Sequence, residues 1–277
     1  MMTNDSLVIM AGGASSRMKR SLETAELDDL VKNAALKLHK SLIPLGKSGK
    51  PLLYYLFKNA AKAGYSNVYL ITAKENEGFK QFLAENEIPQ LNVRFAIQHI
   101  PKGREKPLGT ADALLQCLDQ HPKLQESSFT VCNGDNLYST EALHILRKKR
   151  SVPHATIGYS GSGLGFAKER LAKYAVMAIS PDGFLKQIVE KPSLKEMDKY
   201  LDVFGELRIS MNIFSFSGAE IYPFLVHCPI NPDRGEKELP EAVRNVVARH
   251  SKSLICYSRS ERLPDLTDAN DLKDFYL

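Results

Sequence analysis

The stretch that decides the fold lies at residues 7–17 and reads Leu-Val-Ile-Met-Ala-Gly-Gly-Ala-Ser-Ser-Arg. Four successive apolar residues are typical of a strand that is buried on both faces. The two glycines that follow let the backbone turn tightly and present N–H groups to an anion, and Arg17 adds a permanent charge suited to phosphate. The spacing matches neither the P-loop nor the dinucleotide-binding glycine pattern, which excludes both types of site.

Short apolar runs and helical patterns alternate from this strand to residue 150. Strands are predicted at residues 7–10, 68–72, 93–98 and 129–132, and helices at residues 50–63, 75–85, 110–119 and 141–150. Lys50 is expected to begin the first of these helices, and Thr110 is expected to cap the third. Such alternation predicts a parallel sheet between two layers of helices, with ligands bound at the carboxyl ends of the strands.

The second half is richer in strands. They are predicted at residues 155–159, 174–179, 184–189, 209–216 and 254–257, with helices at residues 218–226, 237–250 and 269–276. Residues 180–183, Ser-Pro-Asp-Gly, predict a hairpin turn. No linker divides the chain, so residues 1–277 are expected to form one α/β domain with halves of about residues 1–150 and 151–277. The predicted architecture is a Rossmann-like three-layer αβα sandwich with a mixed, mostly parallel sheet.

Composition excludes several classes of protein. Of 277 residues, 43% are hydrophobic and 25% are charged, which excludes a disordered chain. No apolar run approaches the ~20 residues that cross a membrane. The net charge of +5 is too small for a nucleic-acid-binding face. Four isolated cysteines without a signal peptide predict reduced, buried thiols and a cytoplasmic location.

The excess positive charge lies near the glycine loop, because residues 1–60 hold nine Lys and Arg against five Asp and Glu.

Further motifs follow the loop, mostly at predicted strand ends. They are Lys40-Ser41-Leu42-Ile43-Pro44-Leu45, Gln98 with Gly109-Thr110, Asn133-Gly134-Asp135-Asn136, and Val189-Glu190-Lys191-Pro192. In this order the set resembles the sugar-1-phosphate nucleotidylyltransferase family over roughly residues 6–265. The resemblance implies the nucleotide-diphospho-sugar transferase type of fold. It also implies Mg²⁺-assisted transfer of NMP from an NTP to a sugar 1-phosphate, with release of pyrophosphate.

The resemblance also implies roles for charged residues. Arg17 is expected to bind the β- and γ-phosphates, and Lys40 to stabilise the transition state at the α-phosphorus. Asp135 is expected to hold Mg²⁺, which agrees with the cost of an unpaired carboxylate at the end of a buried strand. Asp265 is the expected second metal ligand, with Asp268 as its competitor.

The remaining implied roles concern the nucleotide and the acceptor. The expected nucleotide-binding residues are Ala11, Gly12, Gly13, Ser15, Ser16, Gln98, Gly109 and Thr110, with Gln98 facing the base. The expected acceptor-binding residues are Tyr174, Glu190, Lys191 and Asn212. The family usually has glycine where Ala175 and Asn212 stand, so the departures cluster in the second half.

Three questions stay open at this point. Residues 22–38 have a helical pattern, which predicts either a helix packed on the rest of the domain or a flap over the site. The acceptor is a sugar 1-phosphate or, alternatively, an alditol phosphate, a lipid-head precursor or a molybdopterin, and the Glu-Lys-Pro motif favours the sugar. A catalytically silent protein that binds nucleotide sugar is the remaining alternative. The base, the sugar and a homo-oligomeric assembly are left open by the sequence.

Overall fold

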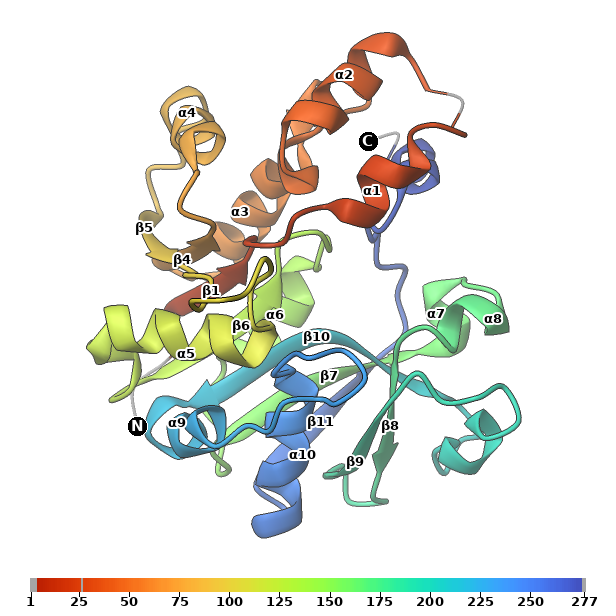
Figure 1. The fold of residues 1–277 in the computed structure, drawn as a ribbon. Coiled ribbons are helices and arrows are strands. Elements are labelled where there is room, and N and C mark those ends of the chain that lie inside the picture. Colours follow the sequence, from red (N-terminus) through yellow and green to blue (C-terminus); the bar gives the residue numbers. More distant parts are fainter. Residues whose placement is uncertain (1–3, 26, 276–277) are drawn as a thin grey trace.

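A nine-stranded sheet runs through the described part of the computed structural model, residues 4–25 and 27–275 (Figure 1). Its strands are β1 Ser6–Met10, β4 Asn67–Thr72, β5 Asn92–Ile97, β6 Ser128–Asn133, β7 His154–Ser160, β8 Ala175–Ile179, β9 Leu185–Glu190, β10 Arg208–Ser217 and β11 Leu254–Arg259. Seven of them follow the order β11-β7-β10-β6-β1-β4-β5, and β8 joins β9 to β10. The short strands β2 Pro44–Leu45 and β3 Lys50–Pro51 pair separately.

The sheet is mixed, as predicted. Strand β1 pairs in parallel with β4 and β6, β5 is parallel to β4, and β11 is parallel to β7. Strand β10 is antiparallel to β6 and β7, and the hairpin β8–β9 is antiparallel as its turn sequence predicts. Four of the six pairings along the seven-strand path are therefore parallel, and residues 1–150 supply three of these four.

Helices cover both faces of the sheet (Figure 1). The described helices are α1 Ser16–Ser21, α2 Asp29–Lys37, α3 Leu52–Ala63, α4 Glu77–Glu85, α5 Thr110–Gln120, α6 Thr140–Arg147, α7 Gly161–Leu164, α8 Lys168–Leu171, α9 Gly218–Val226 and α10 Leu239–Arg249, with 3-10 turns η1 Lys40–Leu42, η2 Pro122–Leu124, η3 Met197–Tyr200 and η4 Ala269–Asp274. Leu7 and Ile9 join the core under α3 and α6, whereas Val8 joins the core under α5, α9 and α10. This alternation along one strand confirms the three predicted layers.

Residues 22–38 do not form one helix, which corrects the sequence prediction. Helix α1 ends at Ser21 and α2 begins at Asp29. The Ser21 hydroxyl donates to the Met18 carbonyl at 2.9 Å, and the Thr24 hydroxyl donates to the Ser21 carbonyl at 3.5 Å. Short hydroxyl side chains here compete for the backbone acceptors that a continuous helix needs, so the chain turns between two short helices.

Smaller differences concern element ends. Lys50 lies in β3, and α3 begins at Leu52 because Pro51 is the N-cap. The last predicted helix is the 3-10 turn η4, and residue 276 lies outside the described residues. Helices α7 and α8 were not predicted, because four residues are too few to show a helical period.

Two predictions from composition can be compared with the structure. No helix among the described residues is long and apolar enough to cross a membrane. Cys117, Cys132, Cys228 and Cys256 are buried and free of disulfides, as expected. Burial raises the pKa of the Cys228 thiol to about 11 and that of Cys117 to about 12, so both stay protonated near neutral pH.

Candidate active site

Two loops meet at the carboxyl ends of the neighbouring strands β1 and β6. The first, residues 11–15, is the glycine loop, and the second holds Asp135 and Asn136. The Gly134 N–H donates to the Met10 carbonyl at 2.9 Å, and the Ala11 N–H donates to the Ile71 carbonyl at 2.8 Å. These bonds continue the sheet past its last strand residues and fix where both loops leave it.

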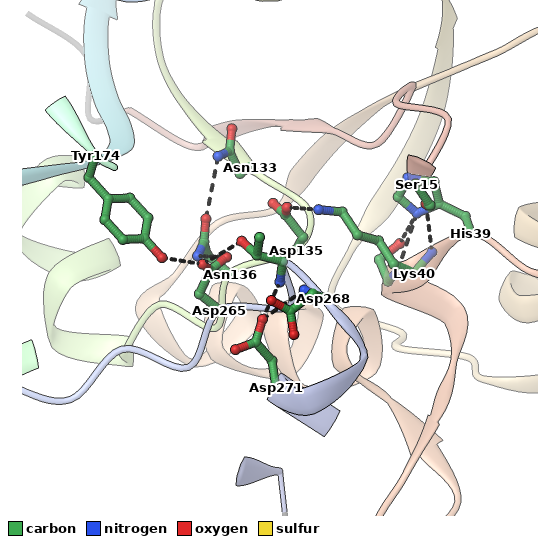
Figure 2. Close-up of polar contacts among 12 residues, drawn as sticks. Ser15, His39, Lys40, Asn133, Asp135, Asn136, Tyr174, Asp265, Asp268 and Asp271 are labelled. Atoms are coloured by element: carbon green, nitrogen blue, oxygen red, sulfur yellow. Dashed lines mark hydrogen bonds and ion pairs between the residues drawn. The ribbon is translucent and has the colours of Figure 1, made fainter. Parts of the chain in front are cut away.

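Lys40 and Asp135 form an ion pair between their Nζ and Oδ2 atoms (Figure 2). Their side chains are only 15% and 19% exposed. Lys40 comes from η1 and Asp135 from the loop after β6, so 95 residues of sequence separate two groups that touch. The structure thus brings together two of the three charged groups that the sequence singled out for catalysis.

Asp265 lies at the same site, beside Asn136, and is 6% exposed. Its carboxylate accepts hydrogen bonds from the Asn136 amide at 2.9 Å, the Tyr174 hydroxyl at 2.5 Å and the Thr267 hydroxyl at 2.7 Å (Figure 2). Burial, and next the negative charge of Asp135, raise the pKa of Asp265. The two carboxylates therefore share one electrostatic environment although they are 130 residues apart in the sequence.

Asp268 has a different position from Asp265. Its Oδ1 atom accepts from the Asn270 N–H at 2.9 Å and caps η4. Asp271 completes this capping box and accepts from the backbone N–H groups of Thr267 and Asp268, each at 2.8 Å. Of the two candidates for the second metal ligand, Asp265 is the one that accepts a hydrogen bond from Asn136, the residue next to Asp135.

Asp135 and Asp265 fit a hard divalent ion. The charge of Asp135 raises the pKa of Asp265, and a divalent ion would relieve the local negative potential that this pair of carboxylates creates. Among the described residues, no group of three or more His, Cys, Asp and Glu side chains is close enough to bind a metal. An ion held by this pair would take its other ligands from phosphate oxygens and water, as Mg²⁺ commonly does.

The glycine loop borders a hollow of about 170 Å³. Gly13, Ser15 and Lys19 line it on the loop and α1, and Lys37 lines it from the end of α2. Arg17 is exposed on α1. Because the end of residues 22–38 forms a wall of this hollow, that segment lies against the glycine loop.

Gln98 lies beside the glycine loop. Its Nε2 atom donates to the Gly109 carbonyl at 3.0 Å, and its Oε1 atom lies 3.0 Å from where a Cβ on Gly12 would be. Gly109 has φ of +114°, and a Cβ there would lie 2.4 Å from the Lys237 carbonyl oxygen, so only glycine fits. Three of the predicted nucleotide-binding residues are thus neighbours.

Thr110 has a different local role from the one expected. The N-cap of α5 is Gly109, and Thr110 is the first helical residue. Its hydroxyl accepts from the Leu239 N–H at 2.9 Å, which ties α5 to α10. The prediction that Thr110 caps the helix is therefore wrong by one residue.

Two of the predicted acceptor residues, Glu190 and Asn212, lie on β9 and β10. The other two lie beside strands, Tyr174 directly before β8 and Lys191 directly after β9. Glu190 pairs with Ala175, and the Lys191 N–H donates to the Tyr174 carbonyl at 3.3 Å. Burial and then the charge of Glu238 raise the pKa of Glu190. The Tyr174 hydroxyl points to Asp265, which links this region to the carboxylate pair (Figure 2).

Asn212 stands at an irregular point of β10. The register with β7 shifts between Ser210 and Phe214, and Asn212 has φ of +52°. Its buried Oδ1 atom has no hydrogen-bond partner within residues 4–25 and 27–275. A buried amide oxygen without a donor is costly, so this atom is a ready acceptor for a ligand hydroxyl.

Several residues that shape the site were not singled out from the sequence. Arg170 forms an ion pair with Asp271 at 2.8 Å and lies 3.8 Å from the Asp265 carboxylate. The spacing of Asp268 and Asp271 is typical of a capping box and could have located the turn that carries Asp265. Nothing local in the sequence marks Arg170, because its partners are about 100 residues away.

Comparison with known protein families gives one match over nearly the whole chain. A family model described as nucleotidyl transferase matches residues 6–270. Bifunctional protein GlmU of Geotalea uraniireducens is 28% identical over 198 residues, which cover 72% of this chain and 36% of that protein. The GlmU protein of Geobacillus thermodenitrificans is 24% identical over 242 residues, or 87% of this chain and 44% of that protein. The chain thus spans less than half the length of these relatives.

Solved structures share the fold. A UDP-glucose pyrophosphorylase, in complex with UDP-glucose, aligns with a TM-score of 0.72 at 17% identity and covers 99% of this chain and 97% of its own. A putative glucose-1-phosphate thymidylyltransferase from Bacillus anthracis, in complex with sucrose, aligns with a TM-score of 0.69 at 18% identity and covers 98% of this chain and 93% of its own. The overlap extends over both halves of the sheet.

Proposed function

This chain belongs to the nucleotidyl transferase family, and we propose that it transfers an NMP group from an NTP to a sugar 1-phosphate. The products are an NDP-sugar and pyrophosphate. The observation that carries the proposal is the cluster of Lys40, Asp135 and Asp265 beside the glycine loop. It combines a cation, a pair of carboxylates suited to a divalent ion and a turn suited to phosphate, which are the groups that phosphoryl transfer needs.

The residues divide the work of an in-line displacement. An oxygen of the sugar phosphate attacks the α-phosphorus, and the bond to the β-phosphate oxygen breaks. Lys40 neutralises charge that develops on the α-phosphate oxygens, and Arg17 binds the leaving β- and γ-phosphates. Asp135 and Asp265 would hold Mg²⁺, which supplies further neutralisation of phosphate charge when bound. The protein's main contribution is alignment of the two phosphate groups.

The acceptor binds against the second half in this proposal. Glu190 accepts from a sugar hydroxyl, Lys191 contacts the sugar phosphate, and Asn212 accepts from a second hydroxyl with its free Oδ1 atom. Gln98 faces the base on the other side, where it lies against Gly12 and Gly109. We further propose that residues 1–277 act as one catalytic domain in the cytoplasm.

A crossed panel of four NTPs and common sugar 1-phosphates tests the proposal by pyrophosphate release with and without Mg²⁺. We expect release only with both substrates and the metal. Lys40→Ala should lower kcat about 10²-fold or more, because a charge interaction that strengthens in the transition state is lost. Lys62→Ala, an exposed lysine on α3, is the matched control. Absence of release with every pair, including alditol phosphates, contradicts nucleotidyl transfer.

A further inference from the structure

Tyr174 contacts the carboxylate pair with its hydroxyl group (Figure 2). The residue lies directly before β8, and the family resemblance implied that it binds the acceptor. In the structure its hydroxyl donates to the Oδ2 atom of Asp265 at 2.5 Å, across 91 residues of sequence. An ionised carboxylate can only accept, so the hydroxyl group is the donor in this bond. The proposed reaction gives this contact no role.

The hydrogen bonds of Asp265 are divided unequally between its two oxygens. The hydroxyls of Tyr174 and Thr267 both donate to Oδ2, at 2.5 and 2.7 Å. The Asn136 amide donates to Oδ1 at 2.9 Å. A carboxylate offers about four lone-pair positions, two on each oxygen. Within residues 4–25 and 27–275 these three bonds occupy both positions of Oδ2 and one of Oδ1, so the position left for a ligand is on Oδ1.

The backbone around Asp265 is fixed relative to Asp135. The Leu266 N–H donates to the Asp135 carbonyl at 2.8 Å, and the Leu137 N–H donates to the Pro264 carbonyl at 3.0 Å. The freedom left to the carboxylate is rotation of the Asp265 side chain, and its last torsion has no sharp intrinsic preference. The groups that bind Oδ2 therefore decide how the carboxylate is turned.

The Tyr174 ring is itself held by its neighbours. It stacks on Phe166 with ring centroids 5.9 Å apart and an interplanar angle of 11°. The Arg170 guanidinium lies over the Phe166 ring, 4.1 Å from its centroid, and forms an ion pair with Asp271 at 2.8 Å. The Tyr174 carbonyl accepts from the Lys191 N–H at 3.3 Å. Tyr174 thus joins the end of the β8–β9 hairpin to Asp265.

We propose that Tyr174 is a positioning residue, whose hydroxyl holds the Oδ2 atom of Asp265 and so keeps Oδ1 available to a divalent cation. The inference rests on the proposed function, in which Asp265 is a metal ligand. Hydrogen bonds to the carboxylates that bind a metal commonly contribute 10- to 100-fold to its affinity. Because Tyr174 also binds Lys191 through its carbonyl, one residue connects the metal pair with the predicted acceptor residues.

Tyr174→Phe removes the hydroxyl and keeps the stacked ring, and Thr267→Val removes the second hydroxyl on Oδ2. Tyr222→Phe is the matched control, because the Tyr222 hydroxyl also donates to an aspartate, Asp119 at 2.7 Å, between α9 and α5. Titration of the full chain with Mn²⁺ alone, followed by the electron paramagnetic resonance signal of the free ion, measures metal binding without substrates. Carboxylate oxygens suit Mn²⁺ as they suit Mg²⁺. Urea unfolding measures the stability of each variant.

We expect Tyr174→Phe to raise the Kd for Mn²⁺ about tenfold, and Thr267→Val to raise it in the same direction. The Mg²⁺ concentration for half-maximal pyrophosphate release should rise in parallel, whereas the KM for the sugar 1-phosphate should stay within about twofold. Tyr222→Phe should leave all three values within about twofold of wild type.

Unchanged Mn²⁺ affinity in Tyr174→Phe with a raised KM for the sugar 1-phosphate would make Tyr174 an acceptor-binding residue and overturn the inference. A loss of affinity that follows the loss of stability, or one that Tyr222→Phe shares, overturns it as well, and so does a wild-type chain that binds no Mn²⁺. The proposed function is judged separately by pyrophosphate release. If Mn²⁺ binding depends on the Tyr174 hydroxyl but no substrate pair releases pyrophosphate, the proposed reaction fails and the positioning of Asp265 by Tyr174 stands.

Discussion

The two halves of the sheet build their parts of the site in different ways. In the first half, strands β1, β4, β5 and β6 are parallel, and the site groups follow directly after β1 and β6. In the second half, an antiparallel hairpin and the irregular strand β10 carry the predicted acceptor residues. In the proposed function, the phosphates are bound where regular strands end, by the glycine loop with Arg17 and Lys40, and the acceptor is bound by side chains of the irregular second half.

Positive φ angles occur at site residues in both halves. The first half has Gly109 at φ of +114° and Ser15 at φ of +53°. The second half places Lys191 at φ of +44° and Asn212 at φ of +52°. Side chains in this region of φ cost about 1 kcal/mol each relative to glycine. Glycine would be less strained at both positions, so the side chains themselves are what the second half retains.

The largest expected effect comes from the first half. Asp135→Asn should lower kcat about 10³-fold, because it removes a carboxylate of the proposed metal pair and the partner of Lys40. Pyrophosphate release under saturating substrates measures it, and thermal unfolding checks that the fold is kept. Activity within tenfold of wild type would show that the carboxyl end of β6 is not where the chemistry occurs.

A somewhat smaller effect is expected at the end of the chain. Asp265→Asn should lower kcat about 10²-fold and raise the Mg²⁺ concentration needed for half-maximal rate. Asp268→Asn is the matched control, because asparagine also caps helices and Asp268 caps η4. The control should stay within about twofold of wild type. The opposite ranking would make Asp268 the metal ligand.

Each half also contains a histidine whose pKa is lowered. Burial lowers the pKa of His39 to about 4 and that of His154 to about 3. In the unfolded chain each of these histidines is protonated below about pH 6.5, whereas in the folded chain both stay neutral to a lower pH. The free energy of unfolding therefore decreases as the pH falls below about 6.5, by about 1.4 kcal/mol for each pH unit and each histidine. Urea unfolding of wild type and His154→Gln between pH 7 and 5 measures this slope. An unchanged slope in the variant would mean that His154 is not neutral in the fold.

The smallest expected effect distinguishes the two halves directly. Asn212→Gly keeps the positive φ and removes the amide, so the KM for the sugar 1-phosphate should rise about tenfold. The KM for NTP should stay within about twofold, and the free energy of unfolding should not fall. Asn212→Ala should show the same rise in KM and a loss of about 1 kcal/mol in stability. An equal rise in both KM values would refute the separation of roles.

The sequence predicted the first half well because its signals are local. A continuous apolar run predicts a strand that both helix layers cover, and the residues after it must lie at the carboxyl edge. Only the family resemblance placed Lys40 and Asp135 at one site, since 95 residues separate them in the sequence. The structure shows the contact itself, and it adds the hydrogen bond that the Lys40 N–H donates to the Ser15 hydroxyl oxygen at 3.2 Å.

The second half was harder to predict for a physical reason. The choice between Asp265 and Asp268 depends on which carboxylate lies near Asp135, and three residues of sequence do not decide this. The 3-10 turn η4, held by Asp271, directs Asp268 to a cap and leaves Asp265 beside Asn136. The break between α1 and α2 was missed because hydroxyl side chains, and not the apolar period, end α1.

The sequence by itself determined the α/β class, the glycine loop and the positions of most strands. These follow from periodicity and from residue chemistry, which act over a few neighbours in the chain. Tertiary structure alone decided that Asp265 shares an electrostatic environment with Asp135, and that the Asn212 Oδ1 atom has no hydrogen-bond partner among the described residues. Such contacts join distant segments, and their energies depend on burial and distance, which exist only once the chain has folded.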